Sequence, residues 1–303
     1  KTATNMLSRE LLFIEKYLGK YPHKEIYIDK VTQSKNPIYG LNQLPSFIRP
    51  FSDVFKWDIT MFKAISKKYI DNTLLLNKRE DYWLLDGIQN YLMIEYVEKV
   101  YPEIKLLGKV SNSWFLKSFN ISKLEFNDKY QFVYQYSSRK FLDQSLTTSL
   151  DSLSNFNRKI VNKYKAGLGF KYLKEYLGGS VLNEAIQELY QNNQLQNISS
   201  QTFRKIISKK TDKNIDWFFG DFINTNKKID YTIDNVKEEK DSLSVTIKNK
   251  RNITAPIALY GLNKKREIKF KKWISNIDSV KTIQVPKGDF NQLVLNFENL
   301  YPE

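Results

Sequence analysis

The chain has 303 residues, of which 41% are hydrophobic and 14% aromatic, so it is long and apolar enough to bury a sizeable core, and two domains are expected. It contains no cysteine, which excludes disulfides and thiolate metal sites, and no run of about 18 uncharged apolar residues such as a membrane-spanning helix needs. The formal net charge is +15, but the lysines are spread along the whole chain, which is more typical of a solvated surface than of a nucleic-acid interface, so no nucleic-acid partner is expected.

The N-terminal region is predicted to be a helix followed by a strand. Apolar residues recur at helical spacing through residues 4–18, and Gly19 is expected to end that helix. Residues 25–31 alternate between polar and apolar types, which predicts a half-buried strand. Residues 36–45 mix turn formers with short extended pieces.

Two helices are predicted next. Asp58 or Thr60 can cap a helix that runs to about Ile70, and a second helix spans about residues 80–100 before Pro102 prevents its continuation. The aromatic residues of the second helix are expected in the core: Tyr82, Trp83, Tyr91 and Tyr96.

The rest of the chain divides into a helical and a β-rich part. Residues 156–222 read as successive helices, with breaks at residues 178–179, 192–200 and 210–214. After residue 225 six short apolar segments alternate with polar turns, which predicts a small antiparallel β-sandwich.

The second predicted helix begins with a recognisable segment. Residues 83–89, WLLDGIQ, resemble the W-L-x-E-G-F-A-type segment of M1-family zinc aminopeptidases, in which the Glu binds zinc. Counting back over the family's spacing reaches residues 63–67, KAISK, where the family has H-E-x-x-H, and residues 68–72, KYIDN, where it has Q-W-F-G-N. Residues 18–22, LGKYP, resemble the family's G-x-Y-P segment.

This resemblance implies an α+β fold with a thermolysin-like (gluzincin) catalytic-type domain. That domain would cover residues 1–226 and be mostly helical in its second half, and the β-sandwich would cover residues 229–303. The metal ligand positions would be vestigial, with Lys63 and Lys67 in place of the two histidines and Asp86 in place of the Glu. Ala64 would stand where the family has its general base.

Two further positions follow from the same resemblance. Residues 36–40, NPIYG, fall where the family has its exopeptidase motif, which would put Tyr39 at the position that binds a substrate amino terminus. Residues 164–167, YKAG, resemble the Y-x-K-G segment, so Tyr164 would be the tyrosine that stabilises the oxyanion. Without a zinc-bound substrate we expect Tyr164 to be a core tyrosine.

Zinc chemistry is not expected, for a reason that does not depend on the family. The chain holds a single histidine, His23, and no cysteine, so it cannot supply two or more nitrogen or sulfur ligands to one zinc ion. A protonated lysine has no lone pair to donate. We therefore expect no cofactor and no catalytic residue. The lysines are predicted to replace the charge of the metal, with Lys63 or Lys67 Nζ within about 4 Å of Asp86, unless they are ordinary lysines of an exposed helical face.

Three functions are compatible with the sequence. The favoured one is an inactive aminopeptidase-like scaffold, with a protein or peptide partner in the former substrate cleft, where an edge strand near residues 38–44 could pair with it. The alternatives are an active metallopeptidase with a rearranged site that uses Asp86 and Tyr164 with an oxygen-preferring metal, and an electrostatic binder of an anionic surface.

The start of the chain leaves its location open. The sequence begins at Lys1, without an initiator Met or a signal peptide, which predicts a processed form or a fragment of a longer protein. The periplasm or the cell envelope is the favoured compartment, within a larger envelope-associated protein.

Overall fold

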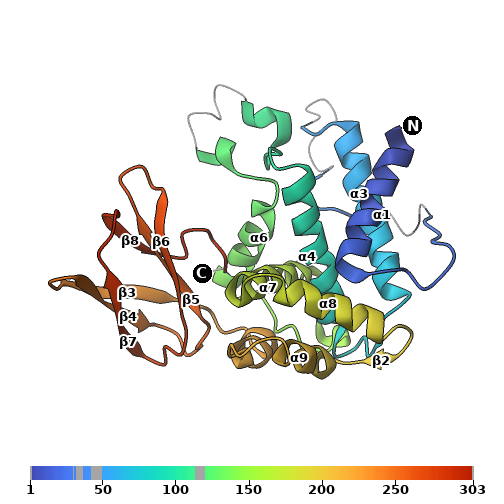
Figure 1. Ribbon diagram of the computed structural model, residues 1–303. Helices are drawn as coiled ribbons and strands as arrows, with labels where there is room; N and C mark the ends of the chain where they lie inside the picture. The colour runs from blue at the N-terminus through green and yellow to red at the C-terminus, as the bar shows by residue number, and fades with distance from the viewer. Residues whose placement is uncertain (1, 30, 32–36, 42–49, 113–119, 302–303) are drawn as a thin grey trace.

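The structure is a computed structural model that describes residues 2–29, 31, 37–41, 50–112 and 120–301. It has a larger helical part and a smaller part made of β-sheets, which lie side by side, with the end of the chain between them (Figure 1). The coarse α+β prediction is confirmed.

The helical part is built from long helices joined by short turns. The α-helices are α1 (Thr2–Leu18), α3 (Asp53–Asp71), α4 (Tyr82–Val100), α6 (Asp128–Arg139), α7 (Asn162–Leu177), α8 (Val181–Asn192) and α9 (Ser200–Ser208). The shorter elements are the 3-10 turns η1 (Gly108–Asn112), η2 (Asn120–Lys123) and η3 (Leu150–Ser152), the π turns η4 (Asn157–Val161) and η5 (Phe218–Phe222), and the parallel pair β1 (Leu75–Leu76) and β2 (Asn197–Ile198).

Helix α4 lies at the centre of the helical part, with α7 packed closely against it (Figure 1). A Cβ atom at Gly167 of α7 would lie 2.6 Å from the Cβ atom of Asn90 on α4, so only glycine allows the two backbones to approach this far. The predicted core aromatics of α4 are all buried. Apolar packing around α4 therefore fixes where its polar residues can lie.

The β-rich part consists of two antiparallel three-stranded sheets, and all six predicted strands are present. The strands are β3 (Tyr231–Glu238), β4 (Ser242–Asn249), β5 (Ile257–Leu262), β6 (Ile268–Ile274), β7 (Val280–Pro286) and β8 (Gln292–Leu295). They are ordered β3-β4-β7 in one sheet and β6-β5-β8 in the other. Tyr172 of α7 packs against Tyr301 and Trp273, at ring-centroid distances of 5.1 and 6.1 Å, and so joins the two parts.

Two local predictions are wrong. Residues 25–29 do not form a strand, although the alternation is real, because Ile26 and Ile28 pack on the core while Tyr27 is exposed. Residues 38–41, within the predicted edge strand, form a turn, and residues 42–44 lie outside the described residues.

Helix α3 begins earlier than predicted. Ser52 is its N-cap, and its hydroxyl accepts a hydrogen bond from the backbone N–H of Phe55 at 3.2 Å. Asp58 is therefore an interior helical residue and not a cap. The predicted end is correct, since the helix stops at Asp71 with Asn72 as its C-cap.

The sequence predicted no membrane-spanning helix, and the helices of the structure can be compared with that prediction. None of the helices in the described part of the chain combines the length and the apolar character that crossing a bilayer requires.

Candidate functional site

The candidate site lies where the end of α3 packs against the start of α4. Lys63 and Lys67 are one turn apart on α3, and the amide of Gln89 on α4 donates to the backbone carbonyl of Lys63 at 2.9 Å. This bond joins the two segments that carry the family resemblance. Asp86 lies one turn before Gln89 on α4.

The predicted contact between these lysines and Asp86 is wrong. Lys67 instead pairs with Asp71, one turn further along α3, at 2.7 Å. Lys63 Nζ donates to the backbone carbonyl of Pro37 at 2.8 Å. The cation nearest Asp86 is Lys163, in the first turn of α7, at 3.5 Å from its Oδ1. Within a helix the i+4 carboxylate is the nearer partner, which explains the choice of Lys67.

The alternative of freely exposed lysines does not describe the site either. The side chains of Lys67 and Lys163 are each 23% exposed, and that of Asp86 is 14% exposed. Three ammonium groups therefore lie half-buried around the end of α3 and the start of α7. Sequence reasoning missed Lys163, although it directly precedes Tyr164 in the Y-x-K-G-like segment.

Burial and neighbouring charges shift the pKa values in this cluster in opposite directions. Desolvation and then the charge of Lys163 lower the pKa of Lys63 to about 7, against the opposing effect of Asp86. Burial acts to lower the pKa of Lys67 too, but Asp71 and Asp86 outweigh it and raise that pKa. Lys129 of α6 is buried near Lys63, and burial followed by the charge of Lys63 lowers its pKa strongly. Positive charge is crowded here.

Beside the cluster is a hollow of about 240 Å³. It is lined by four bases, two acids and three apolar or aromatic residues: Lys67, Lys78, Arg158 and Lys163; Asp71 and Asp86; and Tyr82, Leu85 and Leu150. We call it the cationic hollow. It lies between α3, α4 and the π turn that leads into α7.

Two other positions that the resemblance singles out, Ala64 and Tyr164, belong to no comparable charged cluster. Ala64 is buried, at 5% exposure, and its methyl group cannot accept a proton. Tyr164 is 7% exposed and packs against Tyr130, with ring centroids 4.6 Å apart. Burial, followed by the proximity of Tyr39, raises the pKa of Tyr164. This is the environment expected of a core tyrosine.

The single histidine lies apart from these residues. His23 Nε2 is 3.1 Å from the backbone carbonyl of Asn72, and its ring packs edge-on against Tyr21 at 5.0 Å. It serves the contact between the loop after α1 and the end of α3.

The residues at the positions that the resemblance assigns to metal ligands do not fit a zinc ion. Zinc is held by imidazole nitrogen, thiolate or carboxylate ligands, whereas these positions offer two lysines with partners of their own and one carboxylate already paired with Lys163. Among the residues that the structure describes, no three His, Cys, Asp or Glu side chains come together as a candidate metal site.

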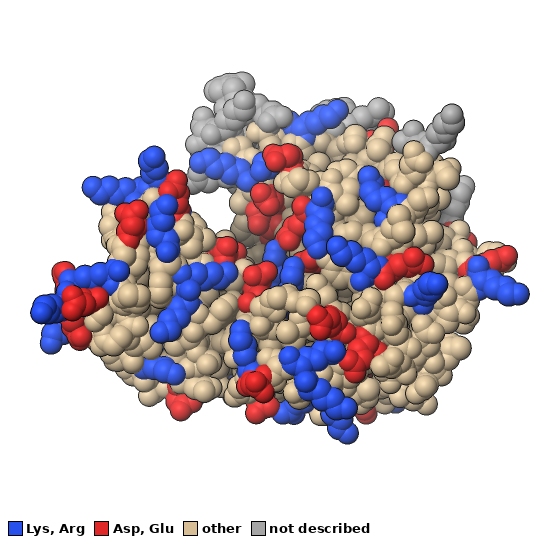
Figure 2. Space-filling view, in the orientation of Figure 1, with Lys and Arg blue, Asp and Glu red and all other residues tan. Residues whose placement is uncertain are grey.

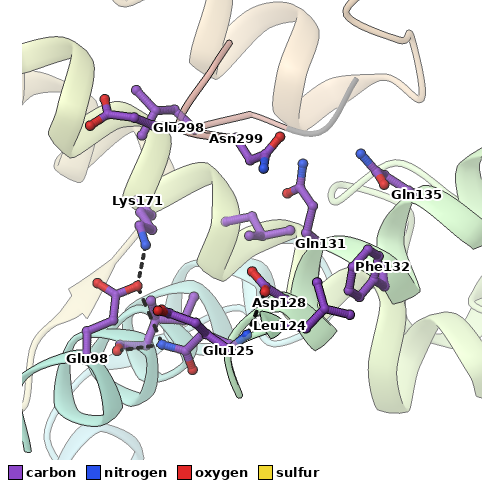
Figure 3. Close-up of a pocket in the computed structure, with 14 residues that line it drawn as sticks. Glu98, Leu124, Glu125, Asp128, Gln131, Phe132, Gln135, Lys171, Glu298 and Asn299 are labelled. Atoms are coloured by element: carbon purple, nitrogen blue, oxygen red, sulfur yellow. Dashed lines mark hydrogen bonds and ion pairs between the residues drawn. The ribbon is translucent and has the colours of Figure 1, made fainter. Parts of the chain in front are cut away.

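A second hollow, of about 270 Å³, lies between α4, α6, α7 and the end of the chain (Figure 3). Its charged groups are mostly acidic but already engaged. Glu98 pairs with Lys171, and Asp128 accepts a hydrogen bond from the backbone N–H of Glu125 at 2.8 Å. Glu298 pairs with Lys271 at 2.5 Å. On the face of the molecule that Figure 2 shows, bases and acids are intermixed.

Comparison with known proteins supports the fold and no more. No protein-family model and no curated protein matches the chain. Among solved structures it is similar to the crystal structure of Legionella pneumophila aminopeptidase A in complex with aspartic acid, with a TM-score of 0.58 and 11% sequence identity. The similarity covers 84% of this chain and 27% of that chain. The chain thus shares a fold with part of that aminopeptidase and spans about a quarter of its length.

Proposed function

We propose that this chain is a non-catalytic peptide-binding module built on an aminopeptidase-like fold. One observation carries the proposal: Lys63 and Lys67, at the positions that the resemblance assigns to metal ligands, are lysines with protein partners of their own. Neither offers an imidazole or a thiolate, a protonated lysine has no lone pair for a metal, and the buried methyl of Ala64 cannot act as a base. A fold retained without these groups is better explained by binding than by hydrolysis.

A peptide is the natural ligand for such a module. The structurally similar aminopeptidase was crystallised with an amino acid, aspartic acid. The cationic hollow lies beside the vestigial positions and is wide enough to admit a side chain. The assignment to the M1 family, the division into domains at about residues 226–229 and a place in the cell envelope belong to this proposal as well.

The first test is hydrolysis and metal content. The purified chain should retain no stoichiometric zinc and release no dye from aminoacyl substrates, with or without added Zn²⁺ or Mn²⁺. Chelator-sensitive release by the unchanged protein would overturn the proposal and favour a rearranged active site. A Tyr164→Phe variant is the matched control, because loss of such release in it would assign the activity to this site.

A rebuilt variant tests the assigned register. Replacing Lys63→His and Lys67→His places two imidazoles one turn apart beside the Asp86 carboxylate, which is the ligand set of a catalytic zinc site. The double variant should bind one zinc ion in a competition titration. Lys67→His with Lys68→His, which puts the two imidazoles on different faces of α3, should not.

A further inference from the structure

We propose that the cationic hollow binds a carboxylate of an acidic peptide segment. The inference rests on the proposed function and specifies its ligand. The groups that would receive the carboxylate are Lys163, Lys67, Lys78 and Arg158, which come from α7, α3, the turn before α4 and the π turn η4.

The hollow holds more positive than negative charge. Its four bases face two acids, Asp71 and Asp86, and each acid is already paired with one lysine. The guanidinium of Arg158 donates to the side chain of Asn155 at 2.8 Å, and among the described residues neither Arg158 nor Lys78 has an ion pair. Two cations at the rim are therefore available to bind an anion.

The excess positive charge lies at the exposed rim, on Lys78 and Arg158, while the partly buried bases Lys67 and Lys163 already have acidic partners. Because Lys67 and Lys163 are each only 23% exposed, water attenuates their interaction with a bound anion less than on an open surface. Lys63 is close enough to Lys163 and Lys67 for their charges to lower its pKa, and it adds a further positive charge when protonated. A bound carboxylate would offset this positive charge, whereas on the face that Figure 2 shows bases and acids are intermixed.

The walls of the hollow favour a side chain over an extended polyanion. Tyr82 and Leu85 are buried and Leu150 is half-buried, and together they form an apolar lining below the charged rim. A Glu or Asp side chain has an apolar stem and a charged end, which suit the apolar lining and the charged rim of the hollow. The concave shape would exclude a lipid surface or a duplex.

Lys63 provides a readout that a diffuse charge effect would not give. Its pKa of about 7 means that it is partly neutral at pH 7 to 8. The charged groups that face it are Lys67 on its own helix, Asp86 on α4, Lys163 on α7 and Lys129 on α6. A carboxylate bound beside this group would raise the pKa of Lys63, so binding at pH 7.5 should take up a proton.

The test is to titrate the protein into two labelled peptides. One is an alanine-based peptide with two adjacent glutamates flanked by leucines, and the other has glutamines in place of the two glutamates. The acidic peptide should bind about tenfold more tightly at low salt. Lys163→Gln should weaken its binding about fivefold and Lys78→Gln, at the exposed rim, about threefold. Lys205→Gln, which removes an equal charge from an exposed position of α9, should leave the affinity unchanged. Calorimetry in buffers of different ionisation enthalpy should detect proton uptake.

The outcomes separate this inference from the proposed function. Equal affinity for the acidic and glutamine peptides would overturn the inference and leave the peptide-binding module standing. Failure of both peptides to bind would overturn both. Inorganic phosphate is included as a competitor. If phosphate binds to the hollow while the acidic peptide does not, the site serves a free oxyanion and the inference is wrong.

Discussion

Helices α3 and α4 pack against each other, and an ionic cluster lies at each end of their interface; the two clusters differ in character. At the start of α3, Asp58 is fully buried and receives hydrogen bonds from Arg9 at 2.8 Å, Tyr96 at 2.9 Å and Tyr101 at 2.7 Å. At the other end Asp86 faces a hollow and has a single lysine at 3.5 Å, with further cations around it. The Asp58 carboxylate is enclosed and bonded to three donors, while the second cluster is open and carries surplus charge.

The difference distinguishes a structural cluster from a binding cluster. A buried carboxylate with three donors leaves little capacity for a ligand, and its partners come from α1 and from the end of α4, so it joins α1 and α4 to α3. Aromatic packing seals it, because the rings of Phe62 and Tyr96 stack with centroids 3.8 Å apart. The open cluster lacks such a seal. If this contrast is correct, substitutions should damage folding at the closed end and binding at the open end.

The largest effect is expected at Asp58. Asp58→Ala leaves the Arg9 guanidinium and two tyrosine hydroxyls without their acceptor, and should lower the free energy of unfolding by about 3 to 5 kcal/mol. Urea denaturation at pH 7 measures it. Asp71→Ala, which breaks a partly exposed pair on the same helix, is the control and should cost no more than about 1 kcal/mol. Similar losses of unfolding free energy in the two variants would contradict the distinction between a structural cluster and a binding cluster.

The second prediction concerns Glu10, which is fully buried beside Asp58. Burial and the neighbouring Asp58 raise its pKa from 4.5 to about 9, so the folded chain holds a proton that the unfolded chain releases. This contribution to stability is complete below pH 4.5 and is lost as the pH rises toward 9.

Glu10→Gln removes that titration. The variant should match the parent chain near pH 4.5 and exceed it by about 2 kcal/mol at pH 8, because an amide needs no proton to remain neutral. Chemical denaturation across this pH range measures both. Parallel curves for the two proteins would show that Glu10 is ionised in the folded state.

The course of the helices could be predicted from sequence, but the contacts across them could not. Apolar spacing located α1, α4 and all six strands. It misplaced the start of α3 because Asp58 is a good cap residue ahead of an apolar run, whereas Ser52 caps the helix and Arg9 from α1 satisfies Asp58. Arg9 and Asp58 are far apart in sequence, so nothing local signals their pairing.

Contacts between helices that are distant in sequence also explain why the candidate site was only partly predicted. Helical spacing places Lys63 and Lys67 one turn apart, and the structure has them so. The partner of Asp86 depended on how α7 crosses α4, which the close contact at Gly167 determines, and that crossing brings in Lys163. Whether these positions descend from metal ligands remains a prediction that the rebuilt histidine variant tests.

A smaller effect is expected at Lys63. Its pKa falls from 10.5 to about 7, so at pH 7 the folded chain holds a destabilised ammonium group. Lys63→Met should raise the free energy of unfolding by about 1 kcal/mol at pH 7, a net value that allows for the lost hydrogen bond to Pro37. The gain should vanish toward pH 10.5, where the Lys63 side chain becomes neutral in the unfolded as well as in the folded chain. Lys205→Met, on the exposed face of α9, should show no such pH dependence. A gain that grows with pH would contradict the crowding of positive charge.

The smallest effect on folding is expected at Lys78, on the rim of the cationic hollow. It is exposed and has no ion pair among the residues described, so Lys78→Gln should change the free energy of unfolding by less than about 0.5 kcal/mol. Its predicted threefold loss of affinity for the acidic peptide would then be a pure binding effect. Asp58 is the opposite case, essential for folding and enclosed away from any ligand. A Lys78 variant that lost stability but kept its affinity would place the open cluster in the same class as the closed one.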